Sequence, residues 1–382
     1  MASYPATVRQ HILVLGGTTF SLVNFRGPMI RAMQARGHRV TAAAGEPDPP
    51  SSTMLADWGV GYEPLRLGRA GLNPLTDFAT LVELMVLMRR VQPDVLFGYM
   101  IKPVIYGLLA ARATRVPHRI AMITGLGYAL MDGPEIKRRF SREVAKVAYR
   151  QSLRFADRVI FQNPDDRNYF LENGLVRGPE QTALVAGSGV DLDHYAPAPL
   201  PGGPVCFLMI ARLLRDKGVA EFAAAARIVK REHPEAQFIL VGPFDPNPSG
   251  IKPAEAEAWV REGIIEYRGT VRDVRPEIAA SHAFVLPSYY GEGIPRTILE
   301  AMAMSRAIVT TDSPGCRETV LEGRNGFLVP PRDADALATA MKRLARDRPF
   351  LVAAGAASLD LARGRFDVNA VNATILEIVE GR

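Results

Sequence analysis

The chain has 382 residues, of which 48% are hydrophobic and 23% charged, and its formal net charge is +6. This length accommodates two domains of ordinary size, and the composition is typical of a soluble globular protein and excludes a disordered one. No apolar run reaches the roughly 18 residues that a membrane-spanning helix needs, and the N-terminus does not resemble a secretion signal. The two cysteines, Cys206 and Cys316, have neither disulfide-framework nor metal-ligand spacing, which favours a reducing cytoplasm.

The excess positive charge lies in the first half of the chain. Residues 1–195 contain 23 basic and 17 acidic residues, whereas residues 196–382 contain 23 of each. This asymmetry indicates an anionic partner, either nucleic acid or an acidic membrane surface. Much of the charge falls in 137–158, which reads as a basic helix lying on anionic lipid or as a surface helix with one stripe facing the core. The basic start of this helix is Lys137, Arg138 and Arg139, and the apolar stripe is Phe140, Val144, Val147, Ala148 and Leu153.

Short apolar runs alternate with helical patterns through the first half, which is typical of βαβ units and a parallel sheet. A helix expected from about 24 to 36 is followed by Gly37, a plausible helix stop. The turn-rich segment 187–201 is the expected hinge between two domains. The expected strands are 11–15, 39–44, 94–98, 119–123, 158–162 and 183–186, with a further helix over 102–112.

The same alternation begins again in the second half. Two consecutive sets of parallel βαβ units predict two Rossmann-like domains, in which ligands bind beyond the carboxyl ends of the strands. We expect an N-terminal domain over 1–190 and a C-terminal domain over 191–365. The expected strands are 206–210, 238–241, 265–267, 283–286, 307–310 and 326–329, with a helix over 220–231.

The segment 291–320, GEGIPRTILEAMAMSRAIVTTDSPGCRETV, places two carboxylates around the start of a helix. Pro295 suits a first helical position because its missing N–H would be unpaired there, and the apolar residues between 298 and 303 have helical spacing. Glu292 then lies in the loop and Glu300 about a turn and a half inside the helix. Since helix N-termini attract phosphate, these carboxylates are better suited to binding sugar hydroxyls.

A second charged motif, ARLLRDKG, follows the expected strand 206–210. Arg212 offers a planar fork for phosphate oxygens and Lys217 a point charge, so the two side chains can hold a diphosphate from two sides. Cations at this position would stabilise the negative charge that develops on a departing nucleoside diphosphate.

Together the two motifs strongly resemble the signature of the retaining nucleotide-sugar glycosyltransferases of family 4. The resemblance implies the GT-B fold, an α/β architecture with two Rossmann-like domains facing each other across a cleft. It implies that Arg212, Lys217 and Glu292 are the catalytic residues, with Glu292 on the donor sugar. It further implies that Glu300 binds the nucleotide ribose and that main-chain groups around Val271 read the base.

The glutamate motif departs from the family at Ile294–Pro295, where many relatives have Phe–Gly. Proline has no N–H to donate, so any main-chain contact made by that glycine is lost here. We expect Arg296 or Thr297 to compensate. Ile294, Arg296 and Thr297 are therefore expected to contact the donor.

The first half carries the expected acceptor residues. Gly16 and Gly17 lack the G-x-G-x-x-G spacing of a nicotinamide dehydrogenase, but they allow main chain to approach the donor closely. The phrases YMIKPVIYG and MITGLGYAL resemble the subgroup that extends polyprenyl-diphosphate-linked glycans, which includes bacterial N-acetylgalactosaminyltransferases. This resemblance implies that Lys102 helps to bind the acceptor diphosphate, an ordinary surface lysine being the alternative. The other expected acceptor contacts are Thr124, Gly125 and Gly127.

The resemblance therefore implies transfer of an N-acetylhexosamine or hexose from a UDP-sugar to a polyprenyl-diphosphate-linked saccharide, in cell-surface polysaccharide or glycoprotein glycan assembly. It also implies that helix 366–382 crosses back to the first domain. We expect no metal or other cofactor, and a cytoplasmic enzyme bound peripherally to the anionic inner face of the membrane. The alternatives are a UDP-sugar 2-epimerase of the same architecture and a non-catalytic nucleotide-sugar-binding protein. Nucleic-acid binding is not expected, because the basic half lacks interleaved aromatics and any recognised module.

Overall fold

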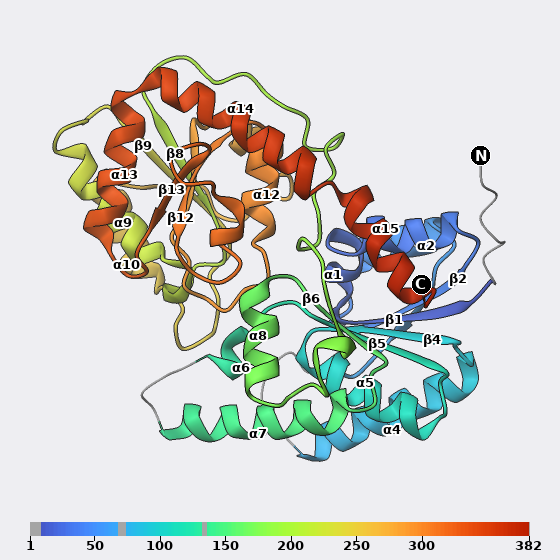
Figure 1. The fold of residues 1–382 in the computed structure, drawn as a ribbon. Coiled ribbons are helices and arrows are strands. Elements are labelled where there is room, and N and C mark those ends of the chain that lie inside the picture. The colour runs from blue at the N-terminus through green and yellow to red at the C-terminus, as the bar shows by residue number, and fades with distance from the viewer. Residues whose placement is uncertain (1–8, 68–73, 132–135, 382) are drawn as a thin grey trace. The chain divides into compact units, whose positions relative to one another are not determined.

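The computed structural model describes residues 9–67, 74–131 and 136–381. The chain divides into two compact units (Figure 1). Unit 1 consists of Met1–Ser188 together with Asn369–Arg382, and unit 2 of Gly189–Val368. The sequence placed the domain boundaries at 190 and 365.

Unit 1 is built on a seven-stranded parallel sheet in the order β3-β2-β1-β4-β5-β6-β7. The strand order reverses between β1 and β4, which in such sheets opens a crevice at the carboxyl ends of the strands. The edge strand β3 was not predicted, because its sequence GYEP contains no apolar run. The strands are β1 (His11–Thr18), β2 (Arg39–Gly45), β3 (Gly61–Pro64), β4 (Val95–Tyr99), β5 (His118–Ile123), β6 (Arg158–Phe161) and β7 (Thr182–Leu184).

Helices cover both faces of this sheet, because alternate strand residues bury apolar side chains on opposite faces. Leu13 and Leu15 share one core with helices α4, α5 and α7, whereas Ile12 and Val14 share the other with α2 and α15. The helices are α1 (Thr19–Asn24), α2 (Gly27–Ala35), α3 (Pro49–Asp57), α4 (Pro74–Val91), α5 (Ile101–Ala113), α6 (Gly127–Leu130), α7 (Ile136–Leu153), α8 (Pro164–Glu172) and α15 (Val368–Val379), with a short 3-10 helix at Pro179–Gln181.

The expectation of one helix over 24–36 was wrong. The chain forms α1 and then α2, with Phe25 and Arg26 between them. Proline at an early helical position starts a helix readily but cannot continue one from the preceding turn, and Pro28 is the second residue of α2. The break leaves Arg26 buried at the junction.

The C-terminal helix α15 belongs to unit 1. Val371, Ile375 and Leu376 are buried in the same core as α2. Glu380, just beyond the helix, accepts hydrogen bonds from Arg36 at 2.9 Å and from Nε2 of His38 at 3.2 Å. Apolar packing and this small polar network together attach the end of the chain to the sheet of unit 1.

Unit 2 repeats the same plan with a six-stranded parallel sheet in the order β10-β9-β8-β11-β12-β13. Its strands are β8 (Cys206–Ile210), β9 (Gln237–Val241), β10 (Glu266–Tyr267), β11 (Ala283–Leu286), β12 (Ala307–Thr311) and β13 (Gly326–Val329). Its helices are α9 (Val219–Lys230), α10 (Pro253–Arg261), α11 (Arg275–Ala279), α12 (Arg296–Ala303), α13 (Ala334–Arg346) and α14 (Arg348–Arg365), with 3-10 turns at Arg215–Lys217 and Arg317–Thr319.

A fully buried arginine fixes the segment that enters unit 2. The Arg306 guanidinium donates to the carbonyl oxygens of Ala198 at 2.9 Å and Pro199 at 3.2 Å, and to that of Ile278 at 2.8 Å. Burial lowers the pKa of Arg306 to about 10. Because a buried guanidinium must be hydrogen-bonded, these carbonyls hold the segment after Gly189 firmly against unit 2. Within the described residues, no helix is both long and apolar enough to cross a bilayer.

Candidate functional site

The charged residues predicted in unit 2 lie in loops at the carboxyl edge of its sheet. Arg212 follows β8, and its guanidinium donates to Asp245, after β9, at 2.7 Å. Lys217, in the 3-10 turn before α9, forms an ion pair with Glu292, in the loop after β11. The Ser288 hydroxyl donates to Glu292 at 2.9 Å. Parallel strands present their carboxyl ends at one edge, so residues from three crossover loops meet there.

An aromatic ring links the two ion pairs. The ring of Tyr290 lies 5.9 Å from the Arg212 guanidinium carbon and 5.3 Å from the Lys217 ammonium nitrogen. Both cations are thus within cation–π distance of a single ring. Burial alone would lower the pKa of Arg212, but the hydrogen bond with Asp245 and the contacts with Tyr290 outweigh it and raise the pKa.

Two glycines allow the loops to approach this closely. Gly218 has φ +78°, and a Cβ there would lie 2.2 Å from the carbonyl oxygen of Pro287. Gly315, also at φ +78°, would place a Cβ 1.7 Å from the carbonyl oxygen of Gly293, next to Glu292. Only glycine combines this conformation with so short a distance. The sequence GEG…DSPG therefore encodes backbone packing as well as the carboxylates.

The second glutamate lies in a separate, buried cluster. Glu300 is inside α12, and its Oε1 accepts from the Tyr195 hydroxyl at 3.0 Å and pairs with Nε of Arg296 at 2.9 Å. Burial raises the pKa of Glu300, while Arg296 and the Tyr195 hydrogen bond oppose that rise. The sequence predicted Pro295 at the first position of the helix. In the structure Pro295 directly precedes the helix, which begins at Arg296.

The remaining predicted donor contacts take different positions. Val271 is half-buried in the loop between β10 and α11, and Thr297 is half-buried near the start of α12. Ile294 is buried, so its side chain packs into unit 2. Of the residues proposed to compensate for the missing glycine, Arg296 is already paired with Glu300.

At the carboxyl edge of unit 1, the double glycine faces protein side chains. A Cβ on Gly16 would lie 2.4 Å from the Tyr99 hydroxyl, and one on Gly17 would lie 2.6 Å from the sulfur of Met100. The Tyr99 hydroxyl is hydrogen-bonded to Ser21 at 2.8 Å. Close packing against Tyr99, the last residue of β4, and the following Met100 is thus a structural reason for both glycines, beside their predicted role at the donor.

Lys102 is neither exposed nor alone. Its ammonium donates to Asp77 of α4 at 3.0 Å, and both side chains are largely buried. Asp77 also hydrogen-bonds Tyr106, whose pKa is raised by burial and then by this carboxylate. Lys102 therefore sits near the start of α5 as half of a part-buried ion pair. The other predicted acceptor residues are half-buried: Thr124 and Gly125 follow β5, and Gly127 is the first residue of α6. The two glycines have φ +122° and +59°.

Sequence reasoning missed several residues at these edges. In unit 2 they are Tyr195, Asp245, Ser288 and Tyr290, and in unit 1 they are Asp77, Arg26, Tyr99 and Gln162. Arg26 is almost fully buried, lies 5.0 Å from the Tyr99 ring and donates to Ser188 at 3.1 Å. The polar phrases PSYYGE after β11 and PFDPN after β9 were the available signal, since polar residues directly after parallel strands point to this edge.

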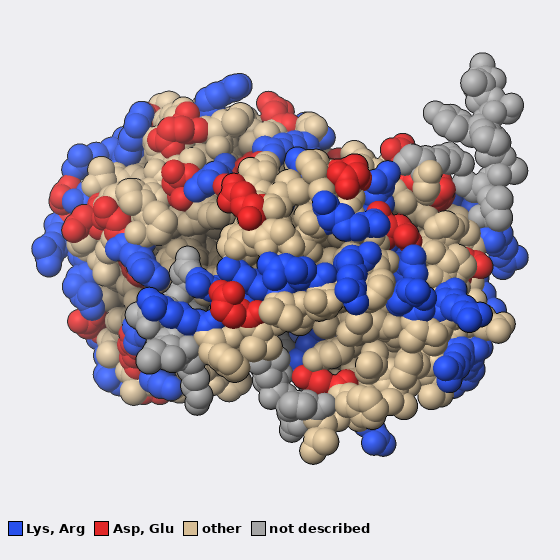
Figure 2. All heavy atoms as spheres, turned by 60° about the horizontal axis from the view of Figure 1, so that its bottom comes forward, with Lys and Arg blue, Asp and Glu red and all other residues tan. Residues whose placement is uncertain are grey.

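The apolar stripe expected on α7 is split between two faces. Leu153 is buried, but Phe140 is 70% exposed and Val147 53% exposed. The residues that contribute to the core are Ala145, Tyr149 and Leu153. Arg139 is exposed, whereas the side chains of Lys137 and Arg138 lie outside the described residues. Figure 2 brings forward the side that carries α4 and α7, where Lys and Arg gather beside uncharged surface.

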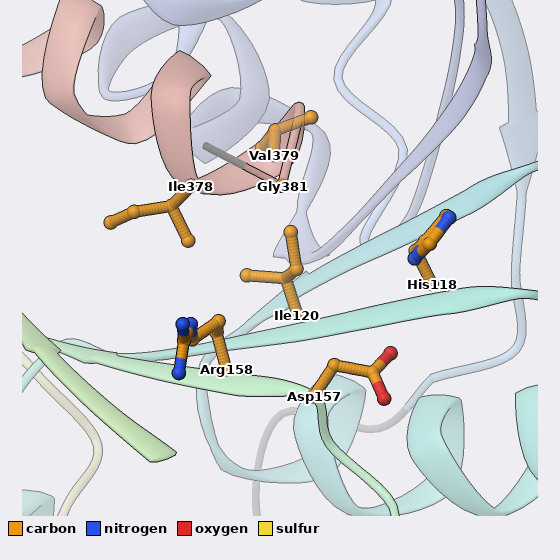
Figure 3. A pocket seen from close by; sticks show the side chains of 7 residues that line it. All are labelled: His118, Ile120, Asp157, Arg158, Ile378, Val379 and Gly381. Carbon is orange, nitrogen blue, oxygen red and sulfur yellow. The ribbon is translucent and has the colours of Figure 1, made fainter. Parts of the chain in front are cut away.

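A cavity of about 200 Å³ lies at the opposite, amino edge of the unit 1 sheet (Figure 3). His118 and Arg158, the first residues of β5 and β6, line it together with Ile378 and Gly381 at the end of the chain. It is therefore remote from the strand ends that carry the predicted site. Among the described residues, no cluster of three or more His, Cys, Asp or Glu side chains could hold a metal ion.

Two family models match the chain. Residues 204–347 match the model described as glycosyl transferases group 1, and residues 26–187 match the glycosyl transferase 4-like domain. The boundary between the matches falls in the segment that joins units 1 and 2.

Two curated relatives illustrate the similarity. One is the N,N'-diacetylbacillosaminyl-diphospho-undecaprenol alpha-1,3-N-acetylgalactosaminyltransferase of Campylobacter jejuni, 29% identical over 86% of this chain and 87% of that protein. The other is the UDP-Gal:alpha-D-GlcNAc-diphosphoundecaprenol alpha-1,3-galactosyltransferase of Escherichia coli, 24% identical over 72% of this chain and 73% of that protein.

Solved structures show the same fold. The Anabaena protein HepE in complex with UDP-glucose has a TM-score of 0.77 and 20% identity, covering 98% of this chain and 100% of its own. A glycosyltransferase from Rickettsia africae has a TM-score of 0.77 and 17% identity, covering 98% of this chain and 99% of its own. The two parallel α/β units therefore form the GT-B fold, as the sequence predicted.

Proposed function

Because the chain belongs to the glycosyltransferases of family 4, we propose that it transfers a hexose or N-acetylhexosamine from a UDP-sugar to a polyprenyl-diphosphate-linked saccharide, with retention of configuration. The observation that carries the donor half of this proposal is the cluster around Tyr290. There Arg212 and Lys217, from two positions after β8, lie against one ring beside Glu292.

This cluster suits a nucleoside diphosphate leaving group. As the glycosidic bond to the donor breaks, negative charge accumulates on the diphosphate, and fixed cations stabilise it without reorganising. The Arg212 fork and the Lys217 ammonium would exchange part of their contact with Asp245 and Glu292 for phosphate oxygens. Glu292, freed in part from Lys217, would then accept hydrogen bonds from donor-sugar hydroxyls.

Glu300 is suited to the ribose. Its Oε1 is occupied by Tyr195 and Arg296, and a carboxylate has acceptor capacity on both oxygens. In the retaining step that we propose, the acceptor hydroxyl attacks from the face that the diphosphate leaves. The leaving phosphate oxygen takes the proton, so no protein base is required.

The acceptor class rests on the relatives. The Campylobacter jejuni and Escherichia coli enzymes both act on sugars linked to undecaprenol through a diphosphate. We assign Lys102 to the acceptor diphosphate, which would compete with Asp77 for the ammonium. A polyprenyl acceptor resides in a membrane, so we also place the enzyme at the cytoplasmic face, with the basic start of α7, including Lys137, Arg138 and Arg139, toward anionic lipid.

A UDP-sugar 2-epimerase and a non-catalytic binding protein are the competing functions. The deciding experiment is a screen for UDP release from a panel of nucleotide sugars, each with and without a lipid-diphosphate saccharide. Transfer predicts UDP release that depends on the acceptor, and an α-linked product from an α-linked donor. Isomerisation of a UDP-sugar without acceptor would establish the epimerase, and UDP binding with no release under any condition would establish the binding protein.

A further inference from the structure

The outward face of helix α4 is apolar along most of its length. The row consists of Leu75, Phe78, Val82 and Val86, which are 82%, 66%, 38% and 59% exposed. These positions follow one another by three or four residues, so they lie along one side of the helix. The opposite side of α4 is buried through Leu84, Leu87 and Met88. A surface helix normally presents polar residues to water, and a continuous exposed apolar row marks an interaction surface.

Helix α7 presents further apolar side chains on the same side of unit 1. Both α4 and α7 contribute to the core that includes Leu13 and Leu15, so both lie on the same face of the sheet. Phe140 and Val147 are the exposed apolar residues of α7. Helices α4 and α7 both pack against α5, and Figure 1 shows them along the same side of unit 1, which Figure 2 brings forward. We call this side the α4–α7 face.

The charge of this face identifies the partner. Among the described residues, Arg139 and Arg150 of α7 are exposed, and α4 ends with the exposed Arg89 and Arg90. A water-soluble partner protein with an apolar contact surface would not require this excess of cations. A bilayer with anionic headgroups offers both an apolar interior for the α4 row and negative charge for the cations beside it. A second copy of the chain would place the two basic helices together, which is unfavourable.

We propose that α4 inserts its apolar row into the acyl region of an anionic membrane, while the cations of α7 bind the headgroups. This inference deepens the proposed function, on which its biological purpose rests, by naming the element that enters the bilayer. Asp77, the partner of Lys102, is in the first turn of α4, on the side of the helix that is turned away from the row. Insertion of α4 would therefore bring the proposed diphosphate-binding lysine to the depth of a lipid-linked diphosphate.

The test compares matched serine variants of the full chain. Phe78→Ser combined with Val86→Ser removes two members of the row without changing charge, and Val260→Ser combined with Val352→Ser removes two residues of unit 2 that are 45% and 55% exposed. Co-sedimentation with phosphatidylglycerol-containing vesicles should weaken by at least about tenfold for the first pair and not for the second, because each inserted apolar side chain adds to the binding free energy. Equal binding of wild type and both pairs would overturn the proposal.

A depth measurement separates insertion from surface attraction. The two native cysteines are buried, so a polarity-sensitive thiol dye will label Val82→Cys or, as the control, Val352→Cys. Vesicles should shift the emission of the dye to the blue at position 82 only, and quenchers placed in the acyl chains should reach it. Quenching by headgroup probes alone, or a dimer in lipid-free solution that Phe78→Ser/Val86→Ser dissociates, would refute insertion. If insertion holds while no lipid-diphosphate acceptor supports transfer, the proposed function fails and the membrane surface stands.

Discussion

Units 1 and 2 have the same strand order around their first strand, yet their carboxyl edges differ in chemistry. The edge of unit 2 carries two cations and their carboxylate partners against the Tyr290 ring. The edge of unit 1 carries Gly16 and Gly17, which pack against Tyr99 and Met100. It also carries the part-buried ion pair between Lys102 and Asp77. The comparison shows that the sheet supplies only the place for a site, while the loops supply the chemistry.

The difference also separates two kinds of electrostatics. In unit 2 the cations are paired within the site, where they can bind a small charged ligand with defined geometry. In unit 1 most of the excess charge lies on α7, on the outside of the sheet, where it can act on an extended surface.

The largest effect is expected in unit 2. Lys217→Ala and Glu292→Ala should each lower sugar transfer by at least about 100-fold, because each removes a group to which we assign stabilisation or orientation of the reacting donor. The matched control is Lys342→Ala, which removes a lysine of the same unit whose ion pair with Glu232 lies on the surface. Initial rates of UDP release measure all three. Near-normal turnover of Lys217→Ala or Glu292→Ala would remove the assignment of this cluster.

A smaller, selective effect is expected in unit 1. Lys102→Ala should raise the KM for the lipid-diphosphate acceptor by about tenfold, the loss of one charge-assisted contact, and leave the KM for the donor unchanged. Asp77→Asn retains the shape of the pair but removes the competing charge, so it should lower the acceptor KM. Steady-state kinetics with each substrate varied in turn will distinguish these results. If the donor KM rises together with the acceptor KM, Lys102 does not act on the acceptor alone, and the assignment of acceptor binding to this edge of unit 1 is wrong.

The buried glutamate cluster predicts a change of a few-fold in nucleotide affinity. Tyr195→Phe removes the hydroxyl that donates to Glu300 and should weaken UDP binding by about three- to tenfold. If Glu300 binds the ribose as we propose, Tyr195 acts through it, so the preference for UDP over 2′,3′-dideoxy-UDP should fall as well, and kcat should remain close to wild type. Calorimetric titration with the two nucleotides provides the measurement. If both nucleotides weaken equally, Tyr195 only supports the fold.

The smallest expected effect concerns stability and not activity. Burial raises the pKa of Asp166 in α8 from 3.8 to about 7, with Asn163 opposing the rise. The folded chain thus holds this proton more tightly than the unfolded chain, so the stabilisation is complete below pH 3.8 and is lost as the pH rises toward 7.

Asp166→Asn removes this titration. The difference in unfolding free energy between wild type and variant should therefore shift against wild type by on the order of 1–4 kcal/mol between pH 4 and pH 8. Urea denaturation at several pH values measures the shift. A difference that does not depend on pH would show that Asp166 ionises normally in the folded chain.

Local patterns predicted the fold because each strand and helix depends on nearby residues. The strands Cys206–Ile210, Ala283–Leu286 and Gly326–Val329 were located to the residue, since each is a short apolar run between turn formers. The edge strand Gly61–Pro64 was missed because an edge strand needs no apolar run. Arg212 with Lys217, and Glu292 with Glu300, were found together because only a few residues separate each pair.

Partners distant in the sequence could not be predicted in this way. Tyr195 and Glu300 are 105 residues apart, and Lys102 and Asp77 lie on different helices. Their contacts depend on which strands become neighbours, and spacing along the chain carries no information on that.

The sequence by itself determined two Rossmann-like units, the paired charged motifs of unit 2 and the charge asymmetry between the halves, because periodicity, turn residues and short spacings are local properties. Only the tertiary structure decided that Lys102 is paired, that Gly16 packs on Tyr99, and that α4 exposes an apolar row. The sequence of α4 is apolar on nearly every side, so it favours no outward face. In the folded chain one side of α4 packs into the core of unit 1 and the other side stays exposed. Tertiary packing therefore decides which apolar residues of α4 face the solvent.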